Sequence, residues 1–100
     1  NGRSQDMEIS LRNDESGDRV INFLSVVVRL DRENMELYRN CLRMNMEFDY
    51  GSLALRGNDL VMYNSILLNG CEPMRFIKSL IYIAAKADEL EEMFVKEDVN

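Results

Sequence analysis

Residues 42–94, LRMNMEFDYGSLALRGNDLVMYNSILLNGCEPMRFIKSLIYIAAKADELEEMF, decide the fold of this chain. Residues 52–56 alternate apolar and polar side chains, Gly57-Asn58 suit a tight turn, and residues 60–68 are apolar on both faces. Pro73 fits the first turn of a helix, where its missing N–H costs nothing. An apolar stripe at helical spacing follows: Phe76, Ile77, Leu80, Ile83, Ala84, Ala87, Leu90 and Phe94. The stretch predicts a β-hairpin followed by a core helix.

The first half of the chain repeats this pattern. Residues 7–12 alternate like a strand with one buried face, and residues 20–30 are apolar on both faces. The polar segment 13–18 between them resembles a calcium loop. An EF-hand is excluded, because aligning its required glycine places Arg12 and Phe23 at ligand positions. Asp31 is then expected to cap a helix that runs to about Glu47.

The predicted order is therefore ββα followed by ββα in one domain spanning residues 1–100. This order indicates an α+β fold, an antiparallel sheet with helices packed on one face. The two strands that are apolar on both faces should be central in the sheet. Helices on one face would cover only half of their apolar surface, so something else must cover the second face.

The helix predicted after Asp31 has an unusually broad apolar arc. Leu37, Cys41 and Met44 form one stripe, and a second stripe of Met35, Tyr38 and Leu42 lies beside it. Only one stripe needs to face the sheet. The first stripe is either a partner-binding surface, for which flexible methionine is well suited, or part of the core of the monomer.

Asn45 lies near the middle of this apolar arc. A buried amide is costly unless it forms hydrogen bonds. We therefore expect Asn45 to tie the helix end to a neighbouring backbone, and prefer this role to ligand binding.

Charge and composition limit the class of function. Eighteen acidic residues against twelve basic ones give a net charge of −6, opposite to the usual balance of a nucleic-acid-binding protein. The chain has no histidine, and its two cysteines lack the spacing of metal ligands, so no metal or other cofactor is expected. The thiols are expected to stay reduced in a cytoplasmic setting. No apolar run approaches the ~18–20 residues of a membrane span.

Four carboxylates crowd the expected end of the last helix, where the helix dipole disfavours negative charge. They are Asp88, Glu89, Glu91 and Glu92. They are either a solvated acidic end that aids solubility, or a docking site for a basic partner or a divalent cation.

The pattern resembles the YbjN-like family, whose fold is shared with the small chaperones of type III secretion. The resemblance is carried by the order and spacing of short phrases along most of the chain. These are Leu42, Asn45 and Tyr50 at a helix end, then Gly51-Ser52-Leu53-Ala54-Leu55, Gly57 in a turn, and Ala87-Asp88 in the closing helix. Family members usually begin with an additional helix and strand. The resemblance thus predicts that these elements have been lost or are supplied by a partner.

These observations favour a non-catalytic protein-binding module, chaperone-like or adaptor-like, acting as a homodimer or on another protein. The candidate partner-binding residues are Leu37, Cys41, Met44, Asp88, Glu89, Glu91 and Glu92. Strand addition at the edge strands 7–12 or 52–56 is a physical route to a partner. The alternatives are a structural subunit of a larger assembly and an acidic cation-binding protein. An enzyme is not expected, since the serines have no histidine base and Cys41 lies on an apolar arc.

Overall fold

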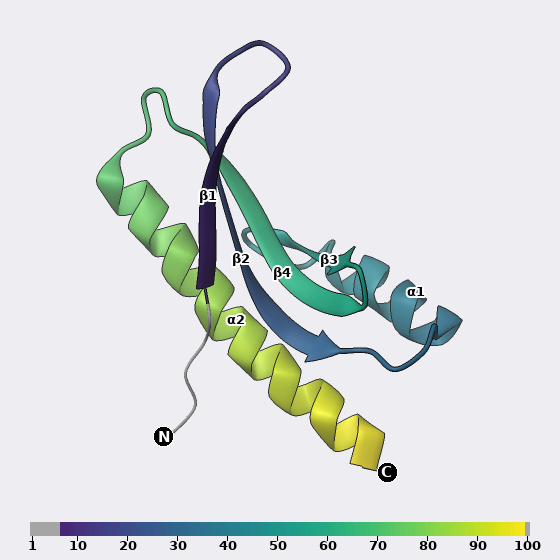
Figure 1. Ribbon diagram of the computed structural model, residues 1–100. Coiled ribbons are helices and arrows are strands. Elements are labelled where there is room, and N and C mark those ends of the chain that lie inside the picture. Colours follow the sequence, from purple (N-terminus) through teal and green to yellow (C-terminus); the bar gives the residue numbers. More distant parts are fainter. Residues whose placement is uncertain (1–6, 100) are drawn as a thin grey trace.

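The computed structural model describes residues 7–99, with side chains from residue 7 to residue 95. Two ββα units follow one another in the predicted order (Figure 1). The elements are β1 Met7–Asn13, β2 Arg19–Arg29, α1 Met35–Met44, β3 Ser52–Arg56, β4 Asp59–Leu67 and α2 Pro73–Val99. The predicted α+β fold is confirmed at this level.

The four strands form one antiparallel sheet in the order β1-β2-β4-β3. The two strands with apolar residues on both faces, β2 and β4, are the central pair, as predicted. Helix α2 packs across these two strands. Phe23 of β2 meets Phe76 of α2 edge to face, with ring centroids 5.6 Å apart.

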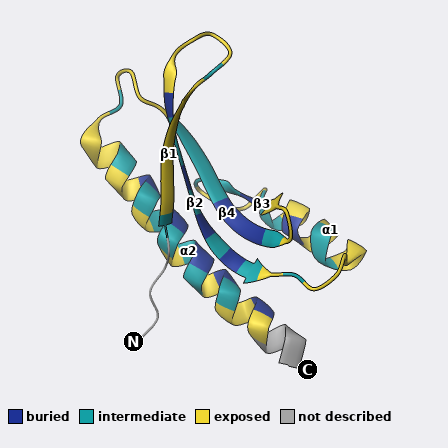
Figure 2. Cartoon of the chain, viewed as in Figure 1, coloured by how far each residue is buried: buried dark blue, intermediate teal, exposed yellow. Residues whose placement is uncertain are grey.

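The core lies between α2 and the sheet and receives side chains from α1. Figure 2 shows the buried residues following one side of α2 and the central strands. The buried members of this cluster are Phe23, Val27, Cys41, Leu53, Leu60, Met62, Ile83, Ala87, Leu90 and Phe94. All but one of the predicted apolar positions of α2 are buried or half-buried, and Ile77 is the exception.

Helix α1 is shorter than predicted and begins later. Its N-cap is Asn34, whose side-chain Oδ1 accepts a hydrogen bond from the Leu37 N–H at 3.0 Å. The expected cap, Asp31, lies outside the helix. The Leu30 N–H donates to the Asn58 carbonyl at 2.8 Å, which holds the chain to the β3–β4 turn beyond the end of β2. Asp and Asn are both favourable N-cap residues, so capping chemistry alone does not distinguish Asp31 from Asn34.

Helix α1 lies beside β3 at one edge of the sheet (Figure 1). The prediction that the helices cover one face is therefore correct for α2, whereas α1 takes a position at the edge. Its end is held there by Asn45, whose Oδ1 accepts from the Leu53 N–H at 2.7 Å and whose Nδ2 donates to the Leu53 carbonyl at 3.3 Å. The predicted role of Asn45 is confirmed. Because Leu53 belongs to β3, this amide occupies part of the outer edge of that strand.

The second face of the sheet is closed in part by the sheet's own curvature. Arg56 of β3 donates from Nη1 and Nη2 to the two carboxylate oxygens of Glu8 in β1, at 2.6 and 2.9 Å. These strands form opposite edges, which a flat sheet with strands ~4.8 Å apart would hold about 14 Å from one another. The sheet must therefore coil so that its second face is concave. This coiling covers part of the second face of the sheet, which α2 leaves uncovered.

Polar side chains occupy the rest of the concave face. Asn22 Oδ1 accepts from the Ser65 hydroxyl at 2.6 Å, the Tyr63 hydroxyl at 3.2 Å and Arg12 Nε at 3.2 Å. On the same face Val61 is only 2% exposed. The concave face thus combines a small apolar centre with a network of hydrogen bonds.

A β-bulge interrupts the ladder between β2 and β4. Val26 pairs with Val61 and Val28 pairs with Leu60, so Val27 has no opposite residue. Val27 is nevertheless buried in the core cluster. The bulge therefore adds an apolar side chain to the core without using a position of the ladder.

Gly51, directly before β3, lies close against Ile83 of α2. Its φ is +74°, a left-handed conformation that favours glycine. A Cβ atom at this position would lie 2.5 Å from Ile83 Cδ1 and 2.6 Å from the Tyr63 carbonyl oxygen. Both neighbours are constrained, because Ile83 is fully buried and the carbonyl belongs to β4. Only glycine fits here without moving the core.

We expect Gly51→Ala to lower the free energy of unfolding by about 2–4 kcal/mol, since it adds a clash in the core to an unfavourable φ. Gly57→Ala is the matched control, because Gly57 also has positive φ but has open space around its Cα. The control should lose only about 1 kcal/mol. Chemical denaturation of both variants measures the difference. Equal losses would show that the close contact at Gly51 does not exist.

The bridge between the two sheet edges predicts a pH effect. The hydrogen bond from Arg56 holds the pKa of the Glu8 carboxyl below its ordinary value. Because the folded-state pKa is lowered, the bridge stabilises the fold above the ordinary carboxyl pKa and is lost as the pH falls through the folded value. In Arg56→Ala we expect the pKa of Glu8 to return toward its ordinary value, followed by NMR titration of the carboxyl carbon. An unchanged pKa would mean that the bridge is absent in solution.

Candidate functional site

The predicted stripe of α1 faces the core of the monomer. Cys41 is buried, and Leu37 and Met44 are half-buried against the core cluster. Exposed apolar side chains instead occupy the neighbouring stripe and the helix end, at Met35, Leu42 and Met46. Of the two alternatives for Leu37, Cys41 and Met44, the structure therefore favours packing within the monomer.

Burial also limits the chemistry of Cys41. It raises the pKa of the thiol, which keeps the sulfur protonated and poorly nucleophilic at neutral pH. The other cysteine, Cys71, lies in the β4–α2 connection and is half-buried.

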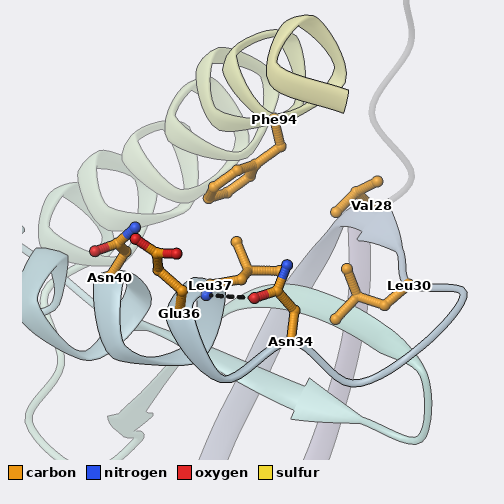
Figure 3. Close-up of a pocket in the computed structure, with 7 residues that line it drawn as sticks. All are labelled: Val28, Leu30, Asn34, Glu36, Leu37, Asn40 and Phe94. Atoms are coloured by element: carbon orange, nitrogen blue, oxygen red, sulfur yellow. Dashed lines mark hydrogen bonds between the residues drawn. The ribbon is translucent and has the colours of Figure 1, made fainter. Parts of the chain in front are cut away.

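Leu37 lines a hollow of about 310 Å³ between α1, the end of β2 and the end of α2. Figure 3 shows Phe94 projecting from α2 toward α1, with Val28 and Leu30 on the opposite side. Glu36 and Asn40 provide polar groups, and the Asn34 side chain is engaged as the helix cap. The volume is at the low end for ligand pockets, and the lining mixes polar and apolar side chains.

Met44 and Glu89 lie together at a second, smaller hollow of about 210 Å³. Lys86 lies at the same place, donates to Glu89 at 3.2 Å and stands 5.9 Å from the centroid of the Phe48 ring. The charge of Glu89 is therefore already compensated within the monomer.

The acidic residues of α2 are neither at the helix end nor grouped as metal ligands. The helix continues to Val99, so Asp88, Glu89, Glu91 and Glu92 are not in its last turn, and the expected conflict with the helix dipole is wrong. At about 100° per residue these four positions fall within one arc of about 160° of the helix, but they differ in exposure. Asp88 and Glu91 are half-buried. Within residues 7–95 no group of three acidic or cysteine side chains is placed to hold a metal ion.

The outer side of β1 is an open sheet edge. No described strand pairs with it, whereas the outer side of β3 is contacted by Asn45. β1 has seven residues, all but one of them exposed. An open strand edge offers a row of backbone donors and acceptors to a further strand.

Exposed apolar side chains border this edge on the α2 side of the sheet. Ile9 and Leu11 of β1 are 54% and 53% exposed, and their ladder partners Phe23 and Ile21 place them on the side covered by α2. Ile77 and Ile81 of α2 are 45% and 62% exposed. We call these four residues, Ile9, Leu11, Ile77 and Ile81, the β1 strip.

Contacts on the opposite flank of α2 place Ile77 and Ile81 on the β1 side. Tyr82 meets Tyr50 edge to face at 5.3 Å, and its hydroxyl accepts from the Asp49 N–H at 3.0 Å. Asp49 and Tyr50 precede β3, so this flank of α2 faces the β3 edge. At about 100° per residue, Ile77 and Ile81 lie on the other flank. Met7, at the start of β1, packs against the core cluster to which α2 contributes, in agreement with this placement.

Sequence periodicity does not identify the β1 strip. Ile77 falls within the predicted core stripe of the helix, and Ile81 lies outside it, where an isolated apolar residue is unremarkable. Two features of the sequence together could have indicated it. Ile81 is an apolar residue outside the core stripe of the helix, and the alternating residues 7–12 predict an edge strand with apolar side chains on one face.

No known family and no curated protein matches this chain. Among the described helices none is both long enough and apolar enough to cross a membrane.

We expect Met44→Asp to destabilise the monomer by about 1–3 kcal/mol, because it places a carboxylate against the core. Met46→Asp is the matched control two residues away, where the side chain is 87% exposed. The control should change the free energy of unfolding by less than about 0.5 kcal/mol. Denaturant titration of the two variants measures the free energy of unfolding. An unchanged value for Met44→Asp would instead favour the α1 stripe as a partner-binding surface.

Proposed function

We propose that this chain is a non-catalytic protein-binding module, chaperone-like or adaptor-like, that binds an extended segment of another protein or of itself along β1. The proposal rests on one observation, the asymmetry of the two sheet edges. Asn45 occupies part of the β3 edge, while β1 is open and bordered by apolar side chains.

Strand addition supplies both affinity and selectivity at such an edge. Backbone hydrogen bonds to β1 would hold any extended segment. Its alternate side chains would contact the residues on the two faces of the sheet, which would select among segments. On one face the added strand meets the β1 strip, and on the other it meets Glu8 and Arg12. A segment that alternates apolar and charged residues fits this surface best.

The resemblance to the YbjN-like family and to secretion chaperones stays a prediction. It fits this proposal, since it implies a partner protein, an extended client segment and no cofactor. The cation-binding alternative receives no support from the placement of the acids, because the described carboxylates do not gather into a site.

Affinity capture from the native cell tests the proposal when variants are compared. The double change Ile9→Lys with Leu11→Lys should reduce recovery of the bound protein at least about tenfold, because two charges replace exposed apolar contacts at the centre of the surface. Leu42→Lys is the matched control, since Leu42 is an exposed apolar residue on α1, away from β1.

The outcome depends on the difference between the two variants. Loss of the captured protein with the β1 variant and retention with Leu42→Lys would support binding at β1. Equal recovery with both variants would contradict the proposal, and circular dichroism of each variant shows that the fold is intact.

A further inference from the structure

We propose that the occupant of the β1 edge is β1 of a second copy of this chain, paired antiparallel about a twofold axis that passes through Ser10. This inference rests on the proposed function, because it takes β1 as the binding surface, and it adds the identity and register of the partner strand. The result is a continuous eight-stranded sheet in a symmetric dimer.

The backbone of β1 presents the groups that such pairing needs. The Asp14 N–H donates to the Asp18 carbonyl at 2.8 Å, so the backbone of Asp14 points toward β2. The direction of the backbone N–H and C=O groups alternates along a strand, so those of the odd-numbered residues of β1 point away from β2. A second strand would therefore form its hydrogen bonds with Ile9 and Leu11.

The side chains of β1 are self-complementary in one register. With the axis at Ser10, Ile9 lies opposite Leu11 of the second copy, and Glu8 lies opposite Arg12 of the second copy. Each contact occurs twice. The apolar pairs fall on the α2 side and the opposite charges on the concave face. Cross-strand pairs of both kinds stabilise a sheet.

Neighbouring registers lose this match. An axis at Leu11 would set Glu8 opposite Asp14, two like charges, and Ile9 opposite polar Asn13. An axis at Ile9 would set Glu8 opposite Ser10 and carry Arg12 past the described start of the strand. The charge pattern therefore selects Ser10 as the centre.

The contacts within the monomer leave room for these pairs. Glu8 accepts two hydrogen bonds from Arg56 within the monomer. A carboxylate has about four acceptor positions, so Glu8 can also accept from Arg12 of the second copy. Arg12 donates from Nε to Asn22 and carries further N–H donors on its guanidinium group. On the α2 side, Ile77 and Ile81 of each copy flank the paired strands and extend the apolar contact.

Charge reversal tests the register in solution. In sedimentation equilibrium, Glu8→Lys alone and Arg12→Glu alone should each weaken self-association about tenfold, because each places like charges opposite one another twice. Mixing the two variants should restore association, since the heterodimer recovers two opposite-charge pairs. Restoration on mixing cannot come from an effect on the monomer fold.

Arg56→Ala is the control for the intramolecular bridge. It removes the partner of Glu8 within the monomer and should leave the dimer intact. Mixed variants that stay monomeric, or a wild-type chain that sediments as a monomer at about 100-fold the concentration used for capture, would overturn the proposal.

A disulfide cross-link tests the position of the axis directly. Ser10 would face its own copy as a non-hydrogen-bonded pair with Cα atoms about 4.5 Å apart, within the range of a disulfide. In a Cys71→Ser background, Ser10→Cys should cross-link under mild oxidation, and Ser16→Cys, exposed in the β1–β2 turn, should not. A dimer that cross-links through neither position would refute this register.

The two proposals fail separately. A monomeric wild-type chain whose captured partner is lost with the Ile9→Lys, Leu11→Lys variant would overturn the dimer and support binding at β1. A dimer that the β1 variants do not weaken would overturn the dimer proposal, and equal capture by the Ile9→Lys, Leu11→Lys and Leu42→Lys variants would overturn binding at β1 as well.

Discussion

The two hydrogen bonds between the Asn45 side-chain amide and the Leu53 backbone cover part of the β3 edge of the sheet. They hold the end of α1 at β3, and they give the N–H and carbonyl of Leu53 the partners that an edge strand lacks. With α1 fixed there, Leu37, Cys41 and Met44 turn toward α2 and the core. The asymmetry between the two edges, on which the proposed function rests, follows from this single side chain.

Curvature is the second constraint on the molecule. The central strands carry apolar residues on both faces, and α2 covers only one of them. The sheet coils until Glu8 of one edge reaches Arg56 of the other, which shelters Val61 without a second layer of helices. Domains of this length have little chain to spare for another layer, and coiling is a way to bury the second face.

Much of this arrangement can be predicted from sequence, and the failures have a common cause. Alternation and turn chemistry predict both ends of every strand to within one residue, and the position of Asn45 on an apolar arc predicts its hydrogen bonds. Periodicity gives the angle of a side chain around its helix. It does not show how far the neighbouring sheet extends, and therefore which of the apolar side chains the sheet covers. For that reason the α1 stripe could not be assigned to core or interface, and Ile77 was expected in the core. The start of α1 was missed because Asp31 and Asn34 are both suitable caps, and only the structure shows that Asn34 accepts the hydrogen bond from Leu37.

Because of the bulge, β2 contains one residue, Val27, that has no partner on β4. On both sides of it the alternation continues, with Ser25 opposite Met62 and Val28 opposite Leu60. Removing Val27 would leave every other residue of the strand on its present face and would take one side chain out of the core. β2 can therefore lose one residue at this point without inverting its faces, whereas elsewhere in the strand a single deletion would turn the sheet's interior outward. Length variation in this fold should be concentrated at the bulge.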